Sequence, residues 1–399
     1  MTIKDGVRCS TAVAYLHPVC RRRPNLTVTT KALVTRIILD RKRAIGVEYI
    51  RNGKTHKAFA EREVILSGGA INSPQLLMLS GIGDADHLRS VGVEPLHHLP
   101  GVGQNLQDHL EVYVQHSCDK PITLYKAQWK FPHQMLGIGL KWILFRRGWG
   151  ATAHLETGGF ARSTADVAHP DIQFHFLPST VHDHGRKMGD QHAYQVHVGP
   201  MRPTSSGQIL LNSPNPEEAP QINPNYMASE QDKAEMRASI RLSREIFSQP
   251  ALSERFGGVE LIPGPNKKTD AELDQFVKNF GDSAYHPSCT CRIGPNPDGH
   301  RISEDEQRKL GYVGNGRVNA AVTQPNCAVW GLDSLRIVDA SIMPSIVSGN
   351  LNAAVVMLAE RASDIILSDY DGHSVILPPA SNIKIWEPDC FEVPHSITA

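Results

Sequence analysis

The segment EVILSGGAINSPQLLMLSGIG, residues 63–83, constrains the possible folds more than any other part of the chain. Its first residues are typical of a buried strand, and they run directly into a glycine turn. Ser73 is expected to cap a short helix, with Pro74 at the first helical position and Gly81 at the end. Such a strand, turn and helix N-terminus occur in α/β proteins either as a site for phosphate or a cofactor edge, or as a purely structural unit.

Other segments predict a mixture of strands and helices. Runs rich in β-branched residues predict strands at residues 26–30, 33–39, 44–50, 208–212 and 335–339. Helical periodicity predicts helices within residues 124–147, 229–249, 270–280 and 348–366. Asp270 is expected to cap the third of these helices, and either Ser348 or Asn352 the last. This order of elements predicts an α+β or α/β fold.

Two further segments, DIQFHFL and AYQVHVG at residues 171–177 and 193–199, share a clear alternation. Apolar residues occupy one face of each strand, and glutamine and histidine occupy the other. Both strands are therefore expected in one sheet that packs on one side. The polar face, which includes His197, either lines a cavity or faces solvent.

Composition excludes several classes of protein. The 399 residues suffice for two or three domains, and 41 basic residues balance 41 acidic ones, so no global field favours nucleic acid. Seven irregularly spaced cysteines favour free thiols over a disulfide framework. The opening residues, MTIKDGVRCS, have the features of neither a signal peptide nor an Arg-rich transit peptide.

The segment SAYHPSCTCRIG, residues 283–294, is the candidate for chemistry. The ordinary pKa of a histidine lies near neutrality, and Pro287 fixes the backbone directly after His286. Three chemistries compete. A zinc site would combine the sequence HLE at residues 154–156 with the two cysteines, but two thiolates one residue apart converge poorly on a metal. The others are a cysteine nucleophile and redox catalysis with His286 as the base.

Four blocks decide between these alternatives. GAINSPQLLMLSGIG, GVGQNLQDH, HPSCTCRIG and VDASIMPSIVSGNLNA match signature blocks of the glucose-methanol-choline (GMC) oxidoreductases, in the order in which that family has them. The resemblance covers about residues 6–370. STAVAYLHP, ATAHLETGGF and DSAYHPSCTC are most similar to the choline-oxidising dehydrogenases of the family. GVGQNLQDH itself is no dinucleotide fingerprint, because Leu106 stands where the third glycine is required.

The resemblance implies an FAD-binding domain that is discontinuous in sequence and a substrate domain with an antiparallel sheet. The expected divisions are residues 1–150 for part of the FAD domain, 151–282 for the substrate domain, 283–372 for the return to the FAD domain, and 373–399 for a tail.

The resemblance also implies the site residues and the reaction. His286 would be the catalytic base and Asn352 its partner, and choline would be oxidised to betaine aldehyde by hydride transfer to the flavin. Substrate-binding residues would be Glu156, His197 and Tyr285. FAD-binding residues would be Val34, Asn105, Asp339, Ala340, Asn352 and Ala353. Relatives of this type imply a respiratory quinone as electron acceptor, a mitochondrial location and a possible membrane association.

Two departures from the family pattern lead to further expectations. The family's initial βαβ unit with GxGxxG is not found in this sequence, so FAD binding by this chain alone is expected to be weak or absent. Residues 304–317 lie in a stretch roughly twenty residues longer than in relatives, which either an ordered surface loop or an artefact of the gene model would explain. The alternatives are another alcohol oxidoreductase of the family and a non-catalytic fragment that acts through protein contacts.

Overall fold

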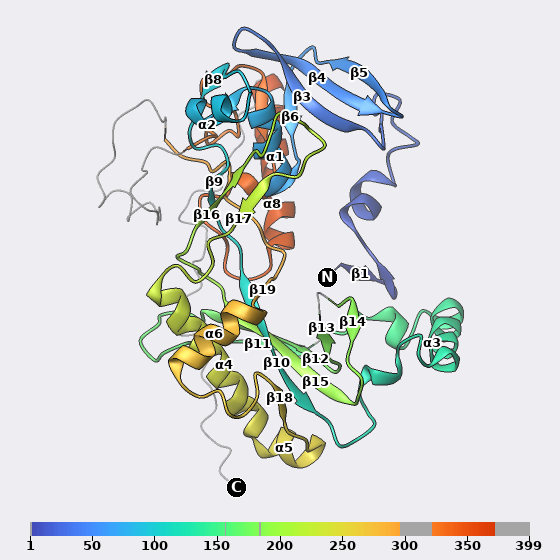
Figure 1. Cartoon of the computed structure of the whole chain (residues 1–399). Coiled ribbons are helices and arrows are strands. Elements are labelled where there is room, and N and C mark those ends of the chain that lie inside the picture. The colour runs from blue at the N-terminus through green and yellow to red at the C-terminus, as the bar shows by residue number, and fades with distance from the viewer. Residues whose placement is uncertain (1, 156, 183–184, 296–320, 372–399) are drawn as a thin grey trace.

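The computed structural model describes residues 2–155, 157–182, 185–295 and 321–371. The described residues form two halves, each with its own hydrophobic core (Figure 1). Glu156, residues 304–317 and the expected tail at 373–399 lie outside the described residues, so the predictions made for them stay predictions.

The first half is built on an antiparallel meander and a short parallel pair of strands. The meander contains β3 (Leu33–Asp40), β4 (Arg43–Arg51) and β5 (Lys54–Phe59). The parallel pair contains β6 (Val64–Leu66) and β20 (Leu335–Ile337), and the helices α1 (Gly69–Leu79) and α8 (Leu351–Asp371) pack nearby (Figure 1). The strand predicted at residues 26–30 is wrong: Leu26 and Val28 are exposed, and this segment pairs with no strand in the described part of the chain.

Helix α1 begins earlier than its sequence predicts. It starts at Gly69, so Ser73 is not its cap and Pro74 lies inside it. Pro74 has no N–H to donate to the carbonyl of Ala70, one turn earlier. The hydroxyl of Thr290 donates to that carbonyl instead, at 2.6 Å, which ties the helix to the candidate segment around His286. The proline is tolerated because a distant side chain replaces the missing donor.

Short elements complete the first half. They are β7 (Ile82–Gly83), α2 (Ala85–Ser90), β8 (His97–His98), β9 (Gln104–Leu106), β16 (Gly207–Leu210), β17 (Gln221–Asn223) and the 3-10 helix η4 (Ala340–Ile342). Strand β16 pairs with both β9 and β17, so the strand expected at 208–212 lies in the first half rather than with the substrate sheet.

The second half is an antiparallel sheet of six strands, as the resemblance implies. Its order is β11 (Thr157–Ala161), β12 (Ile172–Leu177), β15 (Ala193–Pro200), β10 (Leu110–Ser117) and β18 (Glu260–Ile262), and β19 (Asp282–Ser283) also pairs with β10. The alternation in β12 and β15 is confirmed: Ile172 and Phe174 are buried in the core, whereas His175 lies opposite His197 on the other face.

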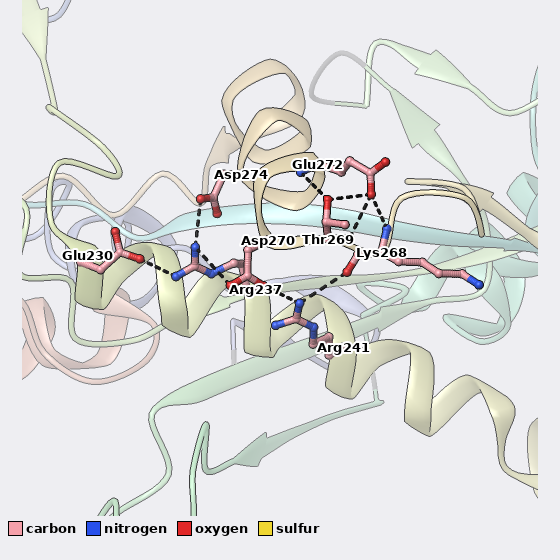
Figure 2. Close-up of polar contacts among 8 residues, drawn as sticks. All are labelled: Glu230, Arg237, Arg241, Lys268, Thr269, Asp270, Glu272 and Asp274. Atoms are coloured by element: carbon pink, nitrogen blue, oxygen red, sulfur yellow. Dashed lines mark hydrogen bonds and ion pairs between the residues drawn. The ribbon is translucent and has the colours of Figure 1, made fainter.

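Helices α4 (Glu230–Ser248), α5 (Pro250–Phe256) and α6 (Asp270–Phe280) belong to the second half. Side chains of α4 and α6 fill the core beneath the sheet. Arg237 of α4 contacts Glu230, Asp270 and Asp274, so it links the two helices (Figure 2). The cap of α6 is Thr269, in a capping box with Glu272, and not Asp270 as predicted, because the helix starts one residue earlier than the sequence indicates.

The remaining elements belong to neither description above, and one of them, η1, reaches the first half, because the hydroxyl of Tyr15 donates to the carboxylate of Glu360 in α8. They are β1 (Ile3–Lys4), β2 (Val7–Arg8), the π-helix η1 (Ala12–Leu16), η2 (Leu124–Lys126), α3 (Pro132–Phe145), η3 (Trp149–Ala151), β13 (Val181–His182) and β14 (Lys187–Met188). Helix α3 confirms the helix predicted within 124–147. Within the described ranges, no helix combines the length and the apolar character that crossing a bilayer requires.

The chain passes between the two cores more often than the expected domain divisions suggest. Leu106 belongs to the first core and Leu110 to the second, while Ile209 is back in the first. The expected boundary at residue 150 therefore differs from the boundary between the cores, which first falls at residues 107–109. A later passage, from Val277 to Cys291, contains His286.

Candidate active site

The backbone around His286 is held by one buried carboxylate. Asp108, 6% exposed, accepts a hydrogen bond from the backbone N–H of His286 at 2.8 Å. Its other oxygen accepts from the hydroxyls of Ser283 and Tyr226, both at 2.5 Å. The loop that carries His286 is thus joined to the segment that precedes β10, and the ring is held in one place.

The ring of His286 has a partner that the sequence did not reveal. Its Nδ1 lies 3.0 Å from Nδ1 of His109, and Nε2 of His109 lies 2.9 Å from the carbonyl oxygen of Met201. A carbonyl can only accept, so Nε2 of His109 carries a proton, and in the neutral ring Nδ1 must accept. The proton between the two rings therefore belongs to Nδ1 of His286, which leaves Nε2 of His286 with a free lone pair.

Electrostatics favours the same protonation states. Burial and the neighbouring His286 lower the pKa of His109 to about 4, so this ring is neutral at neutral pH. Burial also lowers the pKa of His286, although the charges of Asp108 and Glu111 oppose the change. A neutral His286 with an unprotonated Nε2 can accept a proton, which is what a general base requires.

The amide that faces this lone pair comes from Asn350. Its Nδ2 lies 3.4 Å from Nε2 of His286, and its Oδ1 accepts from Nε2 of Gln173 at 3.0 Å. The predicted partner Asn352 lies two residues further on, inside the first turn of α8, so neither Asn352 nor Ser348, the two predicted caps, directly precedes the helix. It lines the same cavity, but the contact with His286 belongs to Asn350.

These groups open onto a cavity of about 1040 Å³. The polar face of the sheet forms part of its wall, through Glu111, Tyr113, His175 and His197. The sequence left open whether this face lines a cavity or meets solvent, and in the structure it lines the cavity. Predicted site residues that the structure brings together here are His197, Tyr285, His286, Asn352 and Ala353.

Glu111 is a second site residue that was not expected. It follows Leu110 in β10 and shares the cavity face with Tyr113, two residues on. The alternation in LEVYVQHS could have revealed a strand, and a carboxylate on its polar face would then have been a candidate. His109 had no such signal, because its contact with His286 spans 177 residues of sequence.

The other predicted cofactor residues lie elsewhere. Val34 lines a second cavity, of about 620 Å³, between the meander and α1. The carboxylate of Asp339 accepts from the backbone N–H of Gly69, the hydroxyl of Ser73 and the backbone N–H of Ser341. It therefore occupies the N-terminus of α1, where the sequence left open either a site for phosphate or a cofactor edge, or a purely structural turn.

Ala340 and Asn105 differ in what surrounds them. The carbonyl of Ala340 accepts from the backbone N–H of Cys289, which joins the two predicted segments. Asn105 has a backbone φ of 63°, and its amide nitrogen is buried with no partner among the described residues. A buried amide without a partner is costly, so this donor is a candidate for contact with a bound group.

Cys289 and Cys291 are packing residues in this structure. Both are fully buried, and burial raises the pKa of the Cys289 thiol to about 12. Both thiols therefore stay protonated at neutral pH, because burial raises the pKa of Cys291 as well. A protonated, enclosed thiol is neither a nucleophile nor a metal ligand.

Comparison with known proteins identifies relatives of this chain. Family models described as GMC oxidoreductase match residues 1–111 and residues 203–305 with 313–359. The mitochondrial choline dehydrogenase of Mus musculus is 53% identical over 392 residues, which is 98% of this chain and 61% of that protein. The enzyme of Homo sapiens is 54% identical and covers 92% of this chain and 58% of its own length. The chain thus spans about three fifths of the length of these curated relatives.

Solved structures show the same fold. A pyridoxine 4-oxidase from Mesorbium loti superimposes with a TM-score of 0.75 at 28% identity, covering 94% of this chain and 64% of that one. A formate oxidase of Aspergillus oryzae RIB40 has a TM-score of 0.81 at 24% identity, covering 93% and 65%. With the family models matching more than half of its residues, the chain belongs to the GMC oxidoreductase family.

Proposed function

We propose that these residues serve the FAD-dependent oxidation of choline to betaine aldehyde. The observation that carries the proposal is the unprotonated Nε2 of His286, which opens onto a cavity together with the Asn350 amide. Relatives named choline dehydrogenase, at 46–54% identity, support choline as the substrate.

Several residues of the chain fit a flavin. The amide nitrogen of Asn105, unpaired among the described residues, offers a donor. Asn352 and Ala353 place the first turn of α8 at the cavity, and the N–H groups of a first turn have no partner within the helix. FAD, when bound, supplies the hydride acceptor. The carboxylate of Asp339 already accepts hydrogen bonds from three donors. It would therefore support a flavin indirectly, by fixing the turn that leads into α1.

His286 and Asn350 would divide the proton chemistry. Nε2 of His286 accepts the proton of the substrate hydroxyl, and the amide of Asn350 donates to the alkoxide oxygen that this step leaves. The resulting charge on His286 is stabilised by Asp108 and Glu111, whose carboxylates both favour the protonated ring. The substrate carbon can then release its hydride.

Recognition of the trimethylammonium group would rest on carboxylates and aromatic rings, since this group cannot donate an ordinary hydrogen bond. The family resemblance assigns the carboxylate to Glu156. Tyr285 is 68% exposed at the cavity, and His197 lies on its wall. If Glu156→Gln leaves the affinity for choline unchanged, that assignment is wrong.

The test is flavin reduction by choline in the 399-residue chain supplied with excess FAD. We expect choline to bleach the flavin faster than an aliphatic alcohol, and His286→Ala to slow the reaction by roughly 10²- to 10⁴-fold. Reduction by the aliphatic alcohol alone would instead support another oxidoreductase of the family. Failure to take up flavin, with a folded circular dichroism spectrum, would favour a non-catalytic role through protein contacts.

For the electron acceptor and the cellular location of the protein, the proposal rests on the names of the relatives. The mammalian relatives are named mitochondrial, which supports a mitochondrial location and a respiratory quinone as the acceptor. Bacterial relatives are named oxygen-dependent, so reoxidation by quinone analogue and by oxygen should be compared directly.

A further inference from the structure

Helix α3 is attached to the protein along a single stripe. None of its residues is buried, and only Met135, Ile138 and Trp142 are half-buried. The indole N–H of Trp142 donates to the carbonyl of Gly6 at 2.7 Å, and the side chains of Ile138 and Trp142 lie against Gly150. Figure 1 shows the helix at the periphery of the second half. Its remaining faces are therefore open to solvent.

A second apolar stripe of α3 is open to solvent. Its members recur at the i, i+4, i+7 and i+8 spacing of one helix face, and each is between 58% and 66% exposed. This outer stripe consists of Leu136, Leu140, Ile143 and Leu144. A contiguous apolar stripe in water is unfavourable, so a partner that covers it would be bound by the hydrophobic effect.

The segment that carries α3 is strongly basic, although the chain as a whole is neutral. Between Asp119 and Glu156 the sequence contains six lysines and arginines and no acidic residue. All six are exposed, and they are Lys120, Lys126, Lys130, Lys141, Arg146 and Arg147. This local excess of positive charge attracts an anionic surface.

Tryptophans stand on both sides of the outer stripe. Trp129, just before α3, is 72% exposed, and Trp149, just after it, is 44% exposed. The guanidinium of Arg146 lies 4.1 Å from the ring centroid of Trp142, so a positive charge is held beside an aromatic ring. Tryptophan is enriched at the headgroup level of bilayers. An apolar helix face with tryptophan and basic residues beside it is typical of a helix that lies in the membrane interface.

Length and charge decide between the possible partners. The 14 residues of α3 are about 21 Å long, which is too short to cross a hydrocarbon layer of about 30 Å. The helix can therefore lie in the plane of a bilayer but not span it. A second copy of the chain would bring two strongly basic segments together, and like charges oppose such an interface.

We propose that α3 and its flanking residues bind the surface of an anionic lipid bilayer. The outer stripe inserts between the acyl chains, and the basic residues contact the lipid headgroups. The inference does not depend on the proposed reaction, because no residue of α3 lines the cavity at His286. The family resemblance implies a possible membrane association without naming a residue, and this surface supplies the residues.

Sedimentation of the 399-residue chain with lipid vesicles tests the proposal. We expect the chain to bind vesicles of phosphatidylcholine mixed with phosphatidylglycerol about tenfold or more tightly than phosphatidylcholine alone. Leu140→Glu combined with Ile143→Glu should weaken binding to the mixed vesicles by about tenfold or more, because it places charge among the acyl chains. The matched control, Leu96→Glu combined with Val259→Glu, adds two glutamates at exposed apolar residues outside α3 and should bind like the wild type.

Charge variants test the contribution of the headgroups. Lys126→Gln combined with Lys130→Gln should weaken binding to the mixed vesicles and leave binding to phosphatidylcholine unchanged. Lys54→Gln combined with Lys57→Gln removes the same charge from the exposed strand β5 and should bind like the wild type. Raising the salt concentration from about 0.1 M to about 1 M should also weaken binding, because it shortens the screening length from about 10 Å to about 3 Å.

A fluorescence measurement on the wild-type chain covers the case in which the glutamate variant does not fold. When mixed vesicles are added, the tryptophan emission should move to shorter wavelength, because Trp129 enters the headgroup region. Trp129→Phe should reduce this shift while the chain still sediments with the vesicles. An emission that does not respond to the vesicles contradicts the proposal.

Two further outcomes would overturn the inference. One is equal binding of the wild type and the Leu140→Glu, Ile143→Glu variant, or no binding to either kind of vesicle. The other is a wild-type chain that ignores vesicles but dimerises in solution, with the glutamate variant monomeric. In that case the outer stripe is an interface between two copies of the chain.

Discussion

At the scale of single residues, the state of His286 is set by its neighbours. His109 accepts the Nδ1 proton of His286 because its own proton is engaged by the Met201 carbonyl. Asp108 fixes the backbone, and Asn350 faces the remaining nitrogen. The base is thus prepared before any substrate arrives, since its tautomer follows from the hydrogen bonds of a second histidine.

Replacing His109 should remove the preference of His286 for the tautomer with its proton on Nδ1. In His109→Leu, the Nδ1 proton of His286 loses its acceptor, so the neutral ring can carry its proton on either nitrogen. Nitrogen-15 NMR of labelled histidine should show the Nδ1–H form of His286 dominant in the wild type and mixed in the variant. The exposed His133→Leu should leave the His286 signals unchanged. An unchanged tautomer in His109→Leu would remove the argument for the lone pair.

The same histidine predicts a pH dependence of stability. The pKa of His109 is about 4 in the folded chain and 6.5 in a free side chain. The unfolded chain therefore binds the proton first, so stability is full above pH 6.5 and falls as the pH decreases toward 4. From about pH 7.5 to about pH 5 the free energy of unfolding should drop by about 2 kcal/mol through this group.

Urea unfolding at the two pH values measures this drop. His116, His175 and His286 also have a lowered pKa and add to the loss with the same sign. His109→Asn should therefore reduce the difference between the two pH values without abolishing it. Equal differences in the variant and the wild type would show that His109 is not held neutral.

At the scale of elements, the sequence predicted periodic segments well and their ends poorly. The alternation in β12 and β15 located the sheet and its polar face, because alternate residues of a strand lie on opposite faces whatever the strand packs against. Helix starts were less predictable: α1 begins four residues before Ser73, and the amide at His286 belongs to Asn350, directly before α8, rather than to Asn352. Contacts such as that of His109 depend on chain topology and have no local signature.

The bond from Thr290 to α1 should be energetically important. Thr290→Val removes the hydroxyl that donates to the carbonyl of the buried Ala70. We expect the free energy of unfolding to fall by about 1–3 kcal/mol. Ser363→Ala, which removes an exposed hydroxyl bond within α8, should cost less than about 0.5 kcal/mol. Denaturant titration compares the two, and equal effects would contradict the role given to Thr290.

At the scale of the whole molecule, the two cores are joined by repeated passages of the chain. Residues 107–109 and the segment from Val277 to Cys291 are two of these passages, and they carry the histidine pair. Because neither core is formed from one continuous segment, we expect them to unfold together. The family fold followed from the sequence blocks, whereas the division of strands between the cores required the structure.

Core variants test this cooperativity. Leu106→Ala in the first core and Leu273→Ala in the second should each cost about 2–5 kcal/mol, since both side chains are fully enclosed. In each variant, tryptophan fluorescence and far-ultraviolet circular dichroism should report one coincident urea transition. Two separate transitions, with each variant shifting only one, would show that the cores are independent.

The contact between His109 and His286 has a consequence for how the two halves of the molecule communicate. Each ring belongs to a different passage of the chain between the cores. The 3.0 Å distance between their Nδ1 atoms therefore depends on how the two halves are aligned. A displacement of one half by about an ångström would lengthen that hydrogen bond beyond its useful range. The basicity of Nε2 of His286 would then change without any alteration at the cavity surface. The alignment of the two halves therefore sets the proton affinity of the base.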